Sequence, residues 1–102
     1  MPESSDTPSI RHNILTEAEA AVYGERQTSY GHPAENFQRT ADLWNGWLKA
    51  RGHTVVLDTF DVAQMMVMLK QARLINTPNH RDSWVDGAGY FAAGARAAGV
   101  DA

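Results

Sequence analysis

The sequence predicts an all-α domain built like a four-helix bundle and completed by association of two or four copies. Apolar residues recur at intervals of three and four in four separate segments, which is the spacing of amphipathic helices. The links between these segments are short and contain Gly, Pro or Asn. The single β-rich run, Thr54–Leu57, is too isolated to make a sheet. A chain of 102 residues therefore holds one helical domain.

The domain is predicted to span residues 13–102 and to follow a flexible N-terminal arm at residues 1–12. The arm is rich in Pro, Ser and charge, and beyond its start only Ile10 is apolar. Such a segment buries too little apolar surface to offset the entropy lost on ordering.

Two helices are predicted in the first half of the domain. Asn13 is a good N-cap for a short amphipathic helix that ends at Gly24. Pro33 suits the first position of a second helix that runs to Ala50 and is stopped by Gly52. The apolar stripe of this second helix consists of Phe37, Ala41, Trp44 and Leu48.

Two further helices are predicted in the second half. The third begins near Asp58 and is apolar nearly all round to Leu74, so we expect it to be central, with Met65, Met66 and Met68 in the core. After a turn at Asn76–Asn79, the fourth runs from about His80 to Ala98. Its many glycines would let another backbone approach closely, and its Trp84 is expected in the core or a subunit interface.

Composition excludes several classes of function. The absence of cysteine removes disulfides, thiolate zinc sites and cysteine nucleophiles. A net charge of -3 argues against binding to a nucleic-acid backbone, which requires a basic face. No apolar run approaches the roughly 18 residues of a membrane span, and residues 1–10 are too polar for a signal peptide. We therefore expect a cytoplasmic protein without a membrane partner.

Two carboxylates on the fourth helix point to phosphate chemistry. Asp82 and Asp86 are four residues apart, so they share one helix face with the small residues that should pack inward. Like charges on such a face require a cation between them. Mg²⁺ prefers carboxylate oxygens and often binds substrate phosphates, which favours a phosphate-ester or anhydride site.

Structural explanations compete with this interpretation. Glu35, Asp61 and Asp82 lie at or near the third position of their helices, where capping and the helix dipole also favour acids. Asp86 lies beyond the first turn, and a functional role is favoured there over an internal ion pair. The candidate partners for such a pair are Lys70, Arg73 and Arg96.

Basic and polar residues offer a matching set of ligand contacts. Lys70 and Arg73 end the third helix, where they either complement its dipole or bind a polyphosphate. Arg26 and Tyr30, in the loop before the second helix, could hold a base by stacking and hydrogen bonding. The run Asn79–His80–Arg81 either holds a nucleotide or simply starts the fourth helix.

Three blocks in this order resemble a small, mostly phage-encoded family of uncharacterised domains that are often labelled MazG-like nucleotide pyrophosphohydrolases. The blocks are YGHPAENFQRTADLW, DVAQMMVMLKQARL and HRDSWVDGAGY, and the similarity covers about residues 14–95. The wider MazG superfamily typically holds Mg²⁺ with E-x-x-E and E-x-x-D motifs and hydrolyses nucleoside triphosphates to monophosphate and pyrophosphate. Here the corresponding pairs are Glu35-x-x-Gln38 and Asp61-x-x-Gln64, so the acidic set is incomplete.

The resulting hypothesis is a MazG-like pyrophosphohydrolase that depends on Mg²⁺, or on Mn²⁺ in its place, and acts on a nucleotide pool in the host cytoplasm. Its metal ligands would be Asp82, Asp86, Asp61 and Glu35, with Asp86, Asp82 and Glu35 catalytic. Its substrate contacts would be Arg26, Tyr30, Asn36, Lys70, Arg73, Asn79, His80 and Arg81. The incomplete motif supports an alternative, a helical oligomer that binds a nucleotide, a signalling molecule or a host protein without turnover. Because Asp61 and Lys70 lie on opposite sides of one helix, both can serve one site only if it straddles the helix or involves a second subunit.

Overall fold

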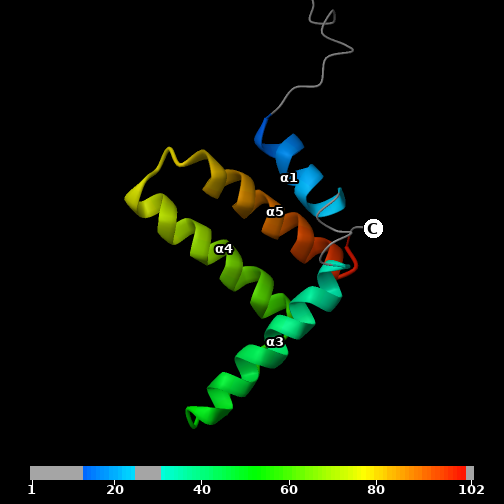
Figure 1. Ribbon diagram of the computed structural model, residues 1–102, viewed down its shortest axis with the longest axis vertical. Coiled ribbons are helices and arrows are strands. Elements are labelled where there is room, and N and C mark those ends of the chain that lie inside the picture. The colour runs from blue at the N-terminus through cyan, green and yellow to red at the C-terminus, as the bar shows by residue number, and fades with distance from the viewer. Residues whose placement is uncertain (1–12, 25–30, 101–102) are drawn as a thin grey trace, which may run out of the picture.

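The computed structural model describes residues 13–24 and 31–100, which form four α-helices and no β-strand (Figure 1). The helices are α1 (Ile14–Tyr23), α3 (Pro33–Ala50), α4 (Thr59–Asn76) and α5 (Arg81–Ala97). This confirms the predicted all-α class. The predicted N-terminal arm, residues 1–12, and the loop residues 25–30 lie outside the described ranges.

Local capping signals place the start of three helices. The Asn13 side chain accepts a hydrogen bond of 2.9 Å from the Thr16 amide at the start of α1. His32 does the same for the Ala34 amide of α3 through Nδ1, at 3.0 Å. Asp58 and Asp61 form a reciprocal capping box at the start of α4. These contacts explain why the predicted helix starts agree closely with the observed ones.

Within one copy of the chain, the described helices form an open arrangement. α4 and α5 make an antiparallel hairpin, α1 lies along α5, and α3 meets the hairpin through the part that begins at Pro33 and ends near Trp44 (Figure 1). The last turns of α3 have no described helix beside them. Leu43 and Trp47 are 75% and 67% exposed.

The connection between α3 and α4 explains this geometry. The Asn45 side-chain amide donates to the Leu57 carbonyl at 2.9 Å, and its oxygen accepts from the Leu57 amide at 2.8 Å. This two-point contact returns the chain to the middle of α3. α4 therefore begins beside the centre of α3, and the last turns of α3 are left uncovered.

The core lies where α3, α4 and α5 meet. Phe37 and Ala41 of α3 are buried against Val62 and Ala63 of α4. Five partly buried residues from the three helices surround this cluster: Trp44, Met66, Tyr90, Ala93 and Ala97. Three of the four residues predicted for the apolar stripe of α3, Phe37, Ala41 and Trp44, are thus confirmed in or against the core.

The prediction that α4 is central holds for one of its faces only. Val62, Ala63, Val67 and Lys70 are buried, and Met66 packs against the core. Met65 and Met68 are exposed, so their predicted core position is wrong within this single chain. Trp84 is also not a core residue, because it is 51% exposed and its Nε1 donates to the Pro78 carbonyl.

The glycine-rich part of α5 permits the close helix contact that the sequence predicted. A Cβ built at Gly94 would lie 2.9 Å from the Ala63 Cβ, closer than real Cβ contacts. We expect Gly94→Ala to lower the free energy of unfolding by about 1–2 kcal/mol, because overpacking outweighs the gain in helix propensity. Chemical denaturation measures this change.

Gly46 provides the matched control for this substitution. It lies inside α3, and a Cβ there would meet nothing within 4 Å. Gly46→Ala should raise the stability by about 0.5–1 kcal/mol through helix propensity alone. Equal effects of the two substitutions would contradict the close packing of α4 on α5.

Candidate functional site

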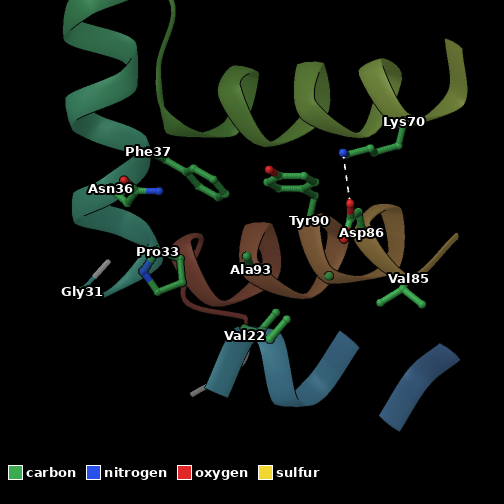
Figure 2. A pocket seen from close by; sticks show the side chains of 12 residues that line it. Val22, Gly31, Pro33, Asn36, Phe37, Lys70, Val85, Asp86, Tyr90 and Ala93 are labelled. Carbon is green, nitrogen blue, oxygen red and sulfur yellow. Dashed lines mark ion pairs between the residues drawn. The ribbon is translucent and has the colours of Figure 1, made fainter. Parts of the chain in front are cut away.

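A pocket of about 340 Å³ opens between all four helices (Figure 2). Its polar residues are Asn36 of α3, Lys70 of α4, and Asp86 and Tyr90 of α5. The rest of its wall is apolar or glycine: Ala21, Val22, Gly31, Pro33, Phe37, Val85, Gly89 and Ala93. Mixed walls of this kind, with a few polar groups on apolar surface, are typical of sites for small molecules.

An ion pair between α4 and α5 dominates the electrostatics of this pocket. Lys70 Nζ lies 3.0 Å from Asp86 Oδ2, and the two side chains are 11% and 36% exposed (Figure 2). Gly87 lies against the lysine, since a Cβ at this position would make an ordinary contact of 3.8 Å with the Lys70 Cβ. A cation buried to this extent requires a counter-charge. Asp86 therefore makes the internal ion pair, the alternative that was predicted less strongly than a functional role.

Asn36 and Tyr90 supply further polar groups whose hydrogen-bonding capacity is not used inside the described ranges. Both residues are half-buried. The Tyr90 ring lies between Phe37 and the ion pair, with its hydroxyl directed toward α3 (Figure 2). Tyr90 was not predicted as a site residue, although it follows Asp86 by one helical turn and so shares its face.

The four predicted metal ligands do not converge. Asp61 is engaged in the capping box of α4, where its Oδ2 accepts from the Asp58 amide at 3.0 Å. Glu35 and Asp82 are exposed in the first turns of α3 and α5. Over residues 13–24 and 31–100, no three Asp, Glu or His side chains lie close enough to share a metal ion. The donors of one copy therefore do not fit a Mg²⁺ ion held by these four carboxylates.

The predicted Asn79–His80–Arg81 contact region lies at the start of α5, where it serves the fold. His80 is the N-cap residue, and its Nδ1 lies 2.8 Å from the Oγ of buried Ser83. Arg81 forms an ion pair with Glu17 of α1, and this hydrogen-bonded contact raises the pKa of the guanidinium. The structure shows the helix-starting role of this run, and its contact with a nucleotide stays a prediction.

The other predicted substrate contacts are divided between the pocket and places away from it. Asn36 and Lys70 line the pocket. Arg73 is exposed in the last turn of α4, where it complements the helix dipole. Arg26 and Tyr30 lie outside the described residues. The structure thus brings together three of the predicted residues, Asn36, Lys70 and Asp86.

Comparison with known proteins places the chain in a family. Residues 13–98 match a family model described as "Domain of unknown function (DUF6378)". The chain belongs to the DUF6378 family. All of the pocket residues described above lie inside the part that matches the DUF6378 model.

Similar proteins come from two phages, which agrees with the resemblance to a phage-type uncharacterised family. The chain is 44% identical over 81 residues to the Gene 55 protein of Mycobacterium phage D29, a match that covers 79% of this chain and 50% of that protein. It is 41% identical over 78 residues to the Gene 55 protein of Mycobacterium phage L5, covering 76% and 47%. The chain spans about half the length of these relatives.

These matches establish DUF6378 membership and do not extend to the MazG superfamily. No solved structure matches the chain. Among the described helices, none is both long and apolar enough to cross a membrane.

Proposed function

We propose that this DUF6378 domain binds a nucleotide, or a phosphorylated small molecule of similar chemistry, in the pocket between its four helices. The observation that supports this most is the position of the Lys70–Asp86 ion pair, which lies in the wall of an open pocket (Figure 2). The volume of about 340 Å³ falls within the range of small-molecule sites. A ligand in this pocket would therefore reach charged groups without any rearrangement of the helices.

The polar groups of the pocket suit the parts of a nucleotide. A lysine ammonium has three N–H donors, of which the pair with Asp86 uses one, so the others can bind phosphate oxygens. The Asn36 amide both donates and accepts, as recognition of a base edge requires. Tyr90 and Phe37 supply aromatic surface against which a base can pack.

Binding of this kind needs no metal ion, which agrees with the incomplete acidic motif. Asp86 is held by Lys70, and Asp61 is held by the α4 cap. Pyrophosphate hydrolysis with Mg²⁺ would require carboxylates that a single copy of the described chain does not bring together. We therefore place binding ahead of hydrolysis and test both in one experiment.

The experiment measures the melting temperature of the protein with a panel of nucleoside mono-, di- and triphosphates, in EDTA and in Mg²⁺. A ligand that prefers the native state stabilises it by about 2.7 kcal/mol at a hundredfold excess over its Kd. We expect at least one nucleotide to raise the melting temperature in EDTA. Failure of every nucleotide in both buffers would contradict the proposal.

A matched pair of substitutions on α3 locates the binding site. Asn36→Ala should weaken nucleotide binding at least about tenfold, since it removes a hydrogen-bonding group from the pocket wall. Gln38→Ala should leave the affinity unchanged, because Gln38 is exposed and hydrogen-bonded to Asp42 on another face of the helix. Isothermal titration calorimetry with the best nucleotide compares the two variants.

Product analysis separates binding from hydrolysis. The same nucleotides are incubated with the protein and Mg²⁺ or Mn²⁺, and pyrophosphate is measured. We expect the nucleotides to be recovered intact. Release of pyrophosphate that is lost in Asp86→Asn would overturn the binding proposal in favour of a pyrophosphohydrolase.

A further inference from the structure

α4 carries a second apolar face, directed away from the core. Met65, Met68, Ala72 and Ile75 follow one another at intervals of three, four and three residues. These are the spacings of the a and d positions in a coiled coil. We call these four residues the α4 seam. On a helical wheel the seam lies opposite Val62, Ala63, Val67 and Lys70, which are the buried residues of α4.

The seam is uncovered in the described chain. Met65, Met68 and Ile75 are 37%, 55% and 85% exposed, and Ala72 is exposed as well. α5 lies along the other side of α4 (Figure 1). Leu69 is also exposed and widens the apolar strip. A contiguous strip of this kind is unusual on a monomer and marks an interaction surface.

We propose that the α4 seam binds the α4 seam of a second copy of this chain, with the two helices antiparallel. A two-fold axis requires a surface that is complementary to itself, and a heptad-spaced apolar strip without a charged member meets this requirement. Flanking positions Gln64 and Gln71 are uncharged, so they place no like charges across the contact.

The helix dipoles favour the antiparallel orientation. In a parallel pair, the positive N-terminal ends of the two α4 helices would lie side by side, and so would their negative C-terminal ends. In an antiparallel pair, the N-terminal end of each helix lies near the C-terminal end of the other, where opposite partial charges attract.

Side-chain size supports the same orientation. When two antiparallel seams overlap fully, Met68 of one copy faces Ala72 of the other, and Met65 faces Ile75. In the two central layers a long flexible methionine then packs over the smallest residue of the seam, and the two outer layers pair methionine with isoleucine. The helix of 18 residues is about 27 Å long, which accommodates the whole overlap.

The association is tested by sedimentation equilibrium of the full chain over a range of concentrations. The wild-type protein should sediment as a dimer, and Met68→Glu should raise the dissociation constant at least about a hundredfold by burying a charge in the contact. Leu43→Glu is the control, because Leu43 is also an exposed apolar residue but lies on α3. Circular dichroism shows that each variant is folded.

The orientation is tested with introduced cysteines, since the chain has none of its own. We expect disulfides when Met65→Cys and Ile75→Cys proteins are mixed, and none within either protein alone. A disulfide can span only about 7 Å between Cα atoms, so self-linking of both single variants would mean a parallel pair and overturn the proposal. A monomeric wild-type protein, or a dimer that Met68→Glu leaves intact, would also overturn it.

Discussion

Phe37→Ala is expected to lower the free energy of unfolding by about 3–5 kcal/mol, the cost of replacing a buried phenylalanine by alanine. Phe37 is 4% exposed and is the largest side chain of the buried cluster that joins α3 to α4. Because α3 meets the hairpin only through the part that ends near Trp44, few other contacts compensate for this loss. Urea denaturation followed by circular dichroism, at one fixed protein concentration, measures the change.

Trp47→Ala is the control for Phe37→Ala, since it removes a still larger aromatic side chain from the same helix. Trp47 is 67% exposed, so its loss should change stability by no more than about 0.5 kcal/mol. The pair of variants therefore tests whether only the part of α3 up to Trp44 is anchored. Comparable losses for both would mean that the last turns of α3 are also packed, and would contradict the open arrangement.

Asp86→Asn is expected to lower the free energy of unfolding by about 2–3 kcal/mol, because it leaves the buried Lys70 ammonium without its counter-charge. Lys70 is the more buried partner, with 11% of its side chain exposed. Thermal or urea unfolding measures the loss. Asp82→Asn, which neutralises an exposed acid four residues earlier on α5, should cost less than about 1 kcal/mol.

The double variant Lys70→Met with Asp86→Leu distinguishes the loss of the ion pair from the cost of leaving one charge unpaired. Replacing a buried ion pair by apolar side chains of similar size is often neutral or stabilising. The double variant should therefore regain most of the stability lost in Asp86→Asn, and it should bind no nucleotide. An additive loss from the two substitutions would show that the side chains do not interact.

The sequence predicts the helices of this domain well because their signals are local. Asn13, Pro33 and the Asp58–Asp61 box each mark a helix start within a few residues of the contact that they make. The close packing of α5 on α4 could also be predicted, because glycines in a helix indicate where a neighbouring backbone can approach. Periodicity likewise placed Phe37 and Ala41 on the buried face.

The open arrangement of the helices could not be predicted in the same way. It depends on the pairing of Asn45 with Leu57, a contact between a side chain and a distant part of the backbone. Hydrophobic periodicity shows that α4 has two apolar faces, but it does not show which of them the same chain covers. Met65 and Met68 were assigned to the core for this reason.

The candidate site could be predicted only in part, because it is formed by contacts between different helices. Helical spacing put Asp86 on an inward face, and its partner Lys70 was among the candidates considered. Helical periodicity does not show which residue of another helix a side chain meets, and for this reason a functional role of Asp86 was favoured over the ion pair that the structure shows. The capping role of Asp61 could be predicted, because its partner Asp58 is only three residues away in the sequence.

The Asn45–Leu57 contact has a consequence for the pocket. It ties the chain that leads into α4 to α3, on the same stretch of α3 that packs Phe37 and Ala41 against α4. Asn36 and Phe37 also form a wall of the pocket. The pocket wall is therefore made by the same packing that forms the core, and the pocket keeps its shape only while that junction is intact.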